Sequence, residues 1–259
     1  MSYQRFSLFP NSPSLKNLLS PRSLRYRWRS GEPVVTTTIM SACTVIWGVE
    51  TLLRFVWPAG FNALLNAGML LPATAMSHPW TFLTSMFLHQ PSSLWHILFN
   101  MMTLWCIGPM LERMMGHLPY LALYTLSGLA GGTGVMVWSA FVPQGWATAV
   151  YGASGSLFGL FAAVLVVYRR TGTDIRSMII WMLINFLLPV IMPNIAWQAH
   201  LGGFTVGGLF VWLLTSRLRV FRGKSLKWCT TVCGIVLLAA IVAIALLCNM
   251  ENPWSQLTF

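Results

Sequence analysis

Residues 152–168 read GASGSLFGLFAAVLVVY, a serine between glycines at the head of an apolar stretch that ends at Arg169 and Arg170. The stretch is apolar and long enough to form a membrane helix. A second apolar stretch, Leu201–Thr215, begins directly after His200. A hydroxyl and an imidazole are both costly to bury in lipid, so their positions at the same end of two apolar segments predict that Ser154 and His200 face one another in a protected pocket.

The composition places the whole chain in a membrane. Hydrophobic residues make up 56% of it, charged residues make up 8%, and the mean hydropathy is +0.67. A soluble domain carries about 25% charged residues. We therefore predict an all-α polytopic membrane protein. Apolar runs near the roughly 20 residues that a span requires occur at Val35–Val56, Ser93–Leu111, Leu118–Phe141, Gly152–Tyr168, Met178–Ile191, Ala199–Leu214 and Trp228–Cys248.

The net charge of +11 is explained by topology rather than by an anionic partner. With these seven spans, every Lys and Arg except Arg54 falls in the tail or loops on the N-terminal side of the membrane. Cytoplasmic loops carry an excess of Lys and Arg. The pattern predicts a cytoplasmic N-terminus and a C-terminus outside, and we expect no nucleic-acid partner.

Three regions follow from this organisation. Residues 1–33 form a basic cytoplasmic tail for which we expect no fold of its own, because they lack a sustained apolar period. Residues 34–216 hold six spans. Residues 217–259 contain a basic loop, the seventh span and an outer tail. The loop from Trp57 to Pro91 is too apolar for water and too interrupted by proline to span, so we expect it to lie in the membrane interface.

The fourth span is short. From Ser154 to Tyr168 a helix covers about 22 Å at its usual rise, against a hydrocarbon core of about 30 Å. With Arg169 and Arg170 held at the cytoplasmic surface, Ser154 would lie below the outer face. Irregular backbone at that depth is tolerated where protein or water surrounds it, so we expect a water-accessible cavity that opens to the outside.

Two further polar residues occupy the outer half of the second span. His96 and Asn100 are four residues apart, so they project from the same face of a helix. Both side chains can donate hydrogen bonds, as a developing oxyanion requires, and the backbone N–H of Ser154 at its helix N-terminus would be a third donor. Ser154, His200, His96 and Asn100 together make a complete hydrolytic set.

Glycine stripes predict that the two central helices approach closely. Gly155 and Gly159 lie one turn apart on the fourth span, and Gly203 and Gly207 do so on the sixth. Small residues at this spacing allow helix backbones to come near each other in lipid. A short serine side chain needs such an approach to reach an imidazole on another helix.

A third catalytic member is not expected. The chain has five acidic residues. The topology places Glu32, Glu112 and Asp174 toward the cytoplasm, and neither Glu50 nor Glu251 is near His200 in sequence. We therefore predict a Ser–His dyad without an acid, and we expect no metal and no cofactor.

Three motifs together resemble the rhomboid intramembrane serine proteases. They are His96-Ile97-Leu98-Phe99-Asn100, the run Gly152-Ala153-Ser154-Gly155, and Ala199-His200 followed by Gly203 and Gly207. The resemblance covers about residues 35–216. It implies a rhomboid-like six-helix catalytic bundle, to which the last span adds a C-terminal transmembrane helix, the six-plus-one form.

The resemblance also implies roles for individual residues. Ser154 would be the nucleophile and His200 the general base, while His96, Asn100 and the Ser154 backbone would form the oxyanion hole. Gly152, Gly155 and Gly203 would support the site. The segment from Leu111 through Glu112 to Gly116 is similar to the family's second-helix end, where the acid is structural.

Two positions depart from the family pattern. Trp80 is followed by Thr81 where an arginine is common, which removes that loop's usual bracing. Phe158 stands where a tyrosine often stacks on the base, so stacking is retained and a hydroxyl contact is lost.

The implied function is an endopeptidase that cleaves transmembrane segments near the outer face. Its partners would be membrane proteins with a destabilised helix, and the lipid bilayer. The six-plus-one order favours a bacterial inner membrane over a mitochondrial one. The alternative is a non-catalytic rhomboid-like protein that binds membrane clients, although such a protein would be expected to lose the serine or the histidine. Small-solute transport is disfavoured, because no charged residues cluster mid-membrane and no inverted repeat is evident.

Overall fold

The computed structural model describes residues 20–172, 174, 176, 179–180, 182–184, 196–216 and 218–254. These ranges are almost entirely helical, and their only extended pairing is an isolated bridge between Leu70 and Val150. The long helices are α3 (Val34–Val56), α6 (Leu94–Met115), α7 (His117–Phe141), α8 (Ser154–Thr171), α10 (Trp197–Thr215) and α11 (Leu226–Asn249). The shorter helices are α2 (Pro21–Arg29), α4 (Pro58–Gly68) and α5 (Thr81–Thr84), with 3₁₀ turns η1 (Pro72–Thr74), η2 (Ser85–Phe87), η3 (Pro143–Ala147) and η4 (Arg219–Phe221).

The all-α polytopic class is confirmed. Among the described residues, α3, α6, α7 and α11 are each long and apolar enough to cross a membrane. Helices α8 and α10 coincide with the fourth and sixth predicted spans but fall outside those four; they are the helices that carry Ser154 and His200. The fifth predicted span, Met178–Ile191, lies mostly outside the described residues.

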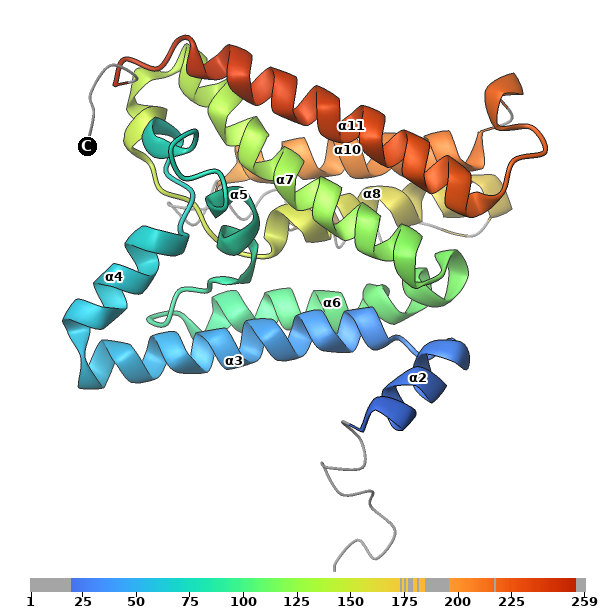
Figure 1. Ribbon diagram of the computed structural model, residues 1–259, viewed down its shortest axis with the longest axis horizontal. Coiled ribbons are helices and arrows are strands. Elements are labelled where there is room, and N and C mark those ends of the chain that lie inside the picture. Colours follow the sequence, from blue (N-terminus) through green and yellow to red (C-terminus); the bar gives the residue numbers. More distant parts are fainter. Residues whose placement is uncertain are drawn as a thin grey trace, which may run out of the picture.

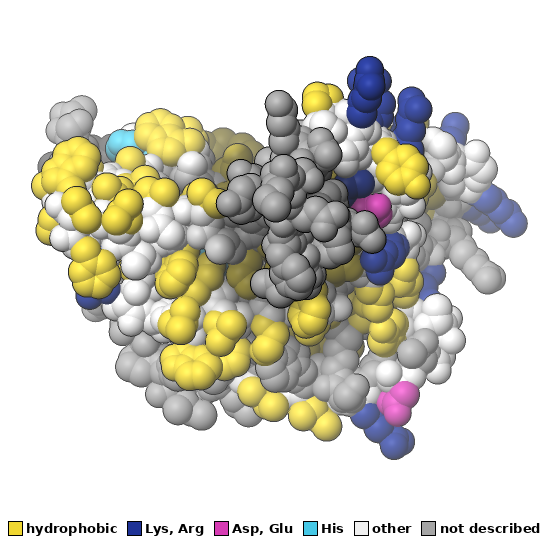
Figure 2. Space-filling view, turned by 90° about the horizontal axis from the view of Figure 1, so that it is seen from below, with side chains coloured by type: hydrophobic (Ala, Val, Ile, Leu, Met, Phe, Trp, Pro, Cys, Tyr) yellow, Lys and Arg dark blue, Asp and Glu magenta, His cyan; other side chains and the backbone are white. Residues whose placement is uncertain are grey.

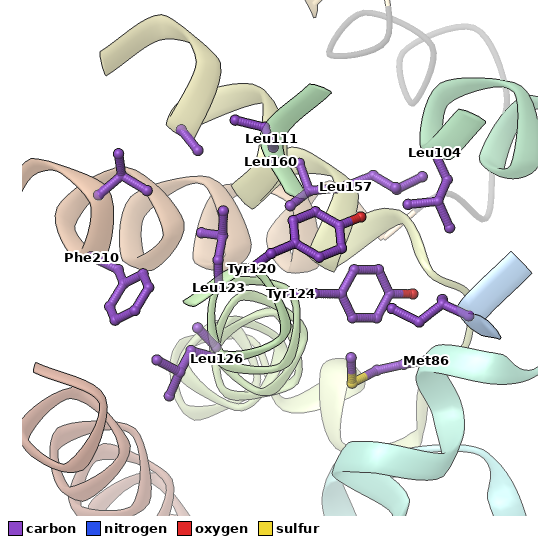
Figure 3. Packing of buried hydrophobic residues seen from close by; sticks show 14 of the residues in the cluster. Met86, Leu104, Leu111, Tyr120, Leu123, Tyr124, Leu126, Leu157, Leu160 and Phe210 are labelled. Carbon is purple, nitrogen blue, oxygen red and sulfur yellow. The ribbon is translucent and has the colours of Figure 1, made fainter. Parts of the chain in front are cut away.

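Helix α7 runs through the centre of the bundle (Figure 1). It packs against α8, α10 and α11, and it also contacts α3 and α6. Side chains from the first half of α7 fill the core between α6 and α8 (Figure 3). The buried residues of this core include Leu104 and Leu111 on α6, Tyr120, Leu123 and Tyr124 on α7, and Leu157 and Leu160 on α8. Lipid is as apolar as these side chains, so close packing rather than escape from water holds such helices together.

The surface agrees with a membrane environment. Large apolar side chains such as Phe55 and Phe141 are about four-fifths exposed, at 79% and 81%. Figure 2 shows hydrophobic side chains spread over the flank of the molecule and most basic side chains gathered at one end. That end carries the last turns of α2 and α8 and the η4 turn.

Glu112 ties the second long helix to the first. Its carboxylate accepts the backbone N–H groups of Val35 and Thr36, both at 2.8 Å, and the Thr36 hydroxyl at 2.6 Å. These amides belong to the first turn of α3, which has no intrahelical partners for them. His117 completes the cluster through its Nδ1 at 2.6 Å from the same carboxylate. Glu112 is thus a structural acid, as the resemblance implied.

The expectation of a tail without regular structure is wrong for residues 21–29, which form α2. Ser20 caps this helix by accepting the Ser23 N–H at 3.2 Å, and Pro21 occupies its first turn, where a missing N–H costs nothing. The carbonyl of Trp28 lies 2.9 Å from Nε2 of His117, and the two rings lie 4.1 Å apart. A long-range contact therefore stabilises a segment whose local sequence has no apolar period.

The segment between α3 and α6 folds into α4, η1, α5 and η2. At the position where the family usually has arginine, Thr81 is buried and donates its hydroxyl to the His78 carbonyl at 2.7 Å. The Trp80 indole donates to the Ala67 carbonyl at 2.9 Å, and the Thr84 hydroxyl donates to the Gly68 carbonyl at 2.9 Å. Backbone carbonyls therefore brace the loop in this chain.

Candidate active site

Ser154 is the first residue of α8. The chain reaches it through Gly152, whose φ of +128° is a backbone conformation that residues with a side chain rarely adopt. The first helical hydrogen bond of α8 runs from the Leu157 N–H to the Ala153 carbonyl at 3.1 Å. The Ser154 N–H therefore belongs to the helix end whose donors have no intrahelical acceptor.

The structure brings His200 to Ser154 across 46 residues of sequence. Nε2 of His200 lies 3.0 Å from Oγ of Ser154, within hydrogen-bond distance. His200 is 4% exposed, and the ring of Phe158 lies parallel to its imidazole with centroids 4.1 Å apart and an interplanar angle of 14°. Phe158 comes from the second turn of α8, so the helix that presents the hydroxyl also fixes the plane of the imidazole.

Glycines make this approach possible. A Cβ built at Gly203 would collide with the carbonyl oxygen of Gly155, and one built at Gly207 would lie 2.5 Å from Cα of Gly159. Both predicted stripes therefore face each other along the contact between α8 and α10. Two glycines of α7 that were not predicted to matter do the same: a Cβ at Gly131 would lie 3.0 Å from the Ala199 carbonyl oxygen, and one at Gly134 would lie 2.6 Å from that of Gln198. Helices α7, α8 and α10 thus meet backbone to backbone.

His96 lies on the other side of Ser154, near the start of α6. A Cβ built at Gly152 would stand 2.8 Å from Nε2 of His96 and 4.0 Å from Oγ of Ser154. Both atoms therefore border the same small space, which the absence of a side chain at Gly152 leaves open. The Gln90 N–H donates to Nδ1 of His96 at 3.3 Å, so in the neutral ring the proton is on Nε2.

Asn100 lies one turn further along α6 and is buried, with 5% of its surface exposed. Its side-chain amide donates one hydrogen bond to the His96 carbonyl at 2.7 Å. An amide nitrogen carries two hydrogens. The observed bond therefore orients the Asn100 side chain on the face of α6 that His96 occupies and leaves a second donor on the same nitrogen.

Two backbone contacts hold the loop that precedes Ser154. The Gly152 N–H donates to the Ser85 carbonyl in η2 at 2.8 Å. Leu70 and Val150 exchange backbone hydrogen bonds of 3.0 and 2.8 Å. The segment between α3 and α6 therefore positions the serine, and nothing in the local sequence of that segment signals this role.

No acid accompanies His200 in the described part of the chain: its Nδ1 is buried there without a hydrogen-bond partner. Glu50, in contrast, is fully buried beside the backbone of His89. Its Oε2 accepts the His89 N–H at 3.1 Å. Neither Glu50 nor His89 stands out in the sequence as a site residue, but the His89 ring lies 5.2 Å from the ring of His96, the candidate oxyanion donor.

Burial near His96 favours the neutral forms of the His89 imidazole and the Tyr151 hydroxyl. Burial, and to a lesser degree the nearby His96, lowers the pKa of the His89 imidazole to about 4. Burial also raises the pKa of the Tyr151 hydroxyl, with a smaller contribution from Glu50. In the described ranges no three His, Cys, Asp or Glu side chains converge as a metal site would require.

Known proteins are similar to about half of this chain. YdcA of Bacillus subtilis is 34% identical over 143 residues, which are 53% of this chain and 68% of that protein. RHOMBOID-like protein 5 of Arabidopsis thaliana is 32% identical over 145 residues, 53% of this chain and 45% of that protein. Rhomboid protease GluP of Bacillus subtilis is 33% identical over 132 residues, 51% of this chain and 25% of that protein. The match thus spans less than half of the latter two proteins.

The model of the rhomboid domain matches residues 76–217, more than half of the 259 residues. This region contains α6, α7, α8 and α10, and with them His96, Asn100, Ser154 and His200. Helices α3 and α11 lie outside it. The motifs, the helical membrane fold and this match agree, and the chain belongs to the rhomboid family.

Proposed function

We propose that this protein is an intramembrane serine endopeptidase that cleaves transmembrane segments of membrane-protein substrates near the outer face. The observation that carries the proposal is the 3.0 Å contact between Oγ of Ser154 and Nε2 of His200 inside the helix bundle. A nucleophile and a base within hydrogen-bond distance, with the base held by a third group, is the arrangement that activates a weak nucleophile. Here the third group is the ring of Phe158.

The first step forms an acyl-enzyme. Nε2 of His200 takes the hydroxyl proton as Oγ of Ser154 attacks the scissile carbonyl, and the imidazolium then gives that proton to the leaving amine. In the second step His200 removes a proton from water, and the hydroxide attacks the acyl carbon. The bond from that carbon to Oγ of Ser154 then breaks, Oγ takes the proton back from His200, and the carboxylic product leaves. The parallel Phe158 ring keeps the imidazole plane fixed through both steps.

The negative charge of the tetrahedral intermediate needs donors that are already in place. Nε2–H of His96 borders the space beside Gly152 together with Oγ of Ser154. The backbone N–H of Ser154 lies at the helix N-terminus, where it has no intrahelical acceptor, and the second amide hydrogen of Asn100 is available on the face of α6 that carries His96. Preorganised donors of this kind lower the barrier because they need no reorganisation as the charge develops. We assign the oxyanion to these three groups.

The substrate must expose a peptide bond that a helix normally shields. A transmembrane segment with small residues at the cleavage point and helix breakers after it would unwind at least cost, so we expect that class of substrate. The basic end of the molecule in Figure 2 would lie in the cytoplasm. We assign the protein to a bacterial inner membrane, with the N-terminus cytoplasmic, because its additional helix, α11, follows the core.

The test uses the full chain reconstituted in lipid vesicles with a tagged single-span substrate. Ser154→Ala and His200→Ala should each lower the cleavage rate by about 10³-fold or more, because each removes one half of a unit that acts together. A fluorophosphonate should label the wild type and His96→Ala but not Ser154→Ala. The products, separated by mass spectrometry, locate the cleaved bond.

Ser156→Ala is the matched control, since it removes a hydroxyl from the same helix two residues away and should retain wild-type cleavage. Retained cleavage in Ser154→Ala or His200→Ala would refute the dyad. Absence of both labelling and cleavage in the wild type, with substrate still captured, would instead identify a non-catalytic protein that binds membrane clients.

A further inference from the structure

We propose that Glu50 is a positioning residue for the oxyanion hole, acting through the His89–Gln90 backbone to hold His96 with its proton on Nε2. This inference rests on the proposed function, because it assigns His96 to the oxyanion. Glu50 belongs to α3, which carries none of the groups that would touch the substrate.

Two consecutive backbone amides make the connection. The N–H of His89 donates to Oε2 of Glu50 at 3.1 Å. The N–H of the next residue, Gln90, donates to Nδ1 of His96 at 3.3 Å. Fixing one peptide group restricts the orientation of the neighbouring one, because only two soft dihedrals separate them. Glu50 therefore determines where the Gln90 N–H points.

The His89 side chain supports the same segment. Its Nδ1 lies 3.1 Å from the Phe87 carbonyl, and because a carbonyl only accepts, Nδ1 donates. The His89 and His96 rings lie 5.2 Å apart, and His89 is fully buried. The short segment between η2 and α6 is thus fastened on three sides: to Glu50, to its own Phe87 carbonyl, and to His96.

The tautomer of His96 is what this arrangement controls. With Nδ1 accepting from Gln90, the hydrogen of the neutral ring is on Nε2, the atom that borders the space beside Gly152 and Ser154. The opposite tautomer would direct a lone pair at that space and would repel an oxyanion. The backbone N–H of Gln90 therefore selects the tautomer of His96 that donates from Nε2. It can do so only while the segment from His89 to Gln90 keeps its position.

Packing alone does not account for a carboxyl group at residue 50. Neighbouring residues of α3 such as Val49, Leu52 and Phe55 are exposed apolar side chains that suit lipid contact. A carboxyl group buried at this depth is costly, and Oε1 of Glu50 has no partner among the described residues. An apolar residue would fill the site more cheaply, so the benefit of Glu50 lies in the acceptor that it supplies to His89.

The test compares Glu50→Gln with Glu50→Leu in the reconstituted full chain. Glutamine keeps a carbonyl acceptor for the His89 N–H, and its kcat should stay within about threefold of wild type. Leucine keeps the volume and removes the acceptor, so kcat should fall about tenfold or more with KM little changed, because the loss concerns the transition state. Each kcat is divided by the fraction of enzyme that a fluorophosphonate titrates, which removes the contribution of misfolded protein.

A second readout follows His96 itself. With ¹⁵N-labelled histidine in lipid vesicles, solid-state NMR distinguishes protonated from unprotonated ring nitrogens, and His96→Gln assigns the signal. Wild type and Glu50→Gln should show one form with the proton on Nε2. Glu50→Leu should show a mixture of the two tautomers, which a loss of stability alone would not produce.

Thr36→Val is the matched control, because it removes a side-chain hydrogen bond, 2.6 Å long, at the opposite end of the same helix. It should lower thermal stability and leave both kcat per titrated site and the His96 signal unchanged. Wild-type kcat in Glu50→Leu, an unchanged His96 signal there, or an equal loss in Glu50→Gln would each overturn the proposal. If the wild type does not cleave, the proposed function fails, and the NMR comparison still decides whether Glu50 holds the His96 tautomer.

Discussion

At the scale of single residues, Phe158 gives the sharpest prediction. Its ring stacks on His200 at 4.1 Å, and aromatic pairs contribute about 0.5–1.5 kcal/mol beyond burial. Phe158→Leu should therefore lower kcat a few-fold to about tenfold, because the imidazole loses its fixed plane. The measurement is cleavage of a membrane substrate in vesicles, with binding reported by KM.

Phe161→Leu is the control for Phe158→Leu. The Phe161 ring packs edge-on against Phe158, with ring centroids 5.7 Å apart, and does not stack on His200. Phe161→Leu should change stability more than kcat. Equal kcat values for the wild type and Phe158→Leu would show that the stacked ring does not orient the base.

Sequence reasoning located the polar residues of the site better than the groups that hold them. Ser154, His200, His96 and Asn100 stand at helix positions whose spacing can be read along the chain. In the structure His200 contacts Ser154, Asn100 contacts His96, and Ser154 and His96 border the space beside Gly152. Glu50 carries no such signal, because its partner is a backbone N–H 39 residues away in an irregular loop. Hydrogen bonds between a side chain and a distant loop backbone leave no periodic pattern.

At the scale of helices, the seam between α8 and α10 is the element most sensitive to volume. Even a Cβ atom at residue 207 would lie only 2.5 Å from Cα of Gly159. The larger side chain of Gly207→Val therefore forces the two helices apart. We expect a loss of stability of about 2 kcal/mol or more and an activity loss of at least about tenfold, because Ser154 Oγ moves away from His200. Thermal unfolding in mild detergent and cleavage assays measure the two effects.

Gly234→Ala on α11 is the matched change, since a Cβ there meets nothing within 4 Å. Alanine is favoured over glycine in a helix by about 1 kcal/mol, so this variant should be as stable as the wild type or more so. If Gly207→Val were tolerated as well as Gly234→Ala, the close approach of α8 and α10 would not be what brings the site together.

Whole helices were predicted more reliably than the tail and the outer loop. Six of the seven predicted spans coincide with helices, because an apolar run of sufficient length has few alternatives in a membrane. Helix α2 and the turns between α3 and α6 depend instead on distant contacts, such as His117 with the Trp28 carbonyl and Leu70 with Val150. Local composition carries no information on contacts of that kind.

At the scale of the whole molecule, the charge distribution predicts a topology. Seven spans place the two termini on opposite sides, and the gathering of basic side chains at one end predicts that this end faces the cytoplasm. A green fluorescent protein fused before residue 1 should fluoresce in a bacterial host, and an alkaline phosphatase fused after residue 254 should be active outside. The same phosphatase fused after Gly223, before α11, should be inactive, because that loop lies on the basic side. Activity after Gly223 together with inactivity after residue 254 would invert the orientation and move Ser154 to the cytoplasmic half of the membrane.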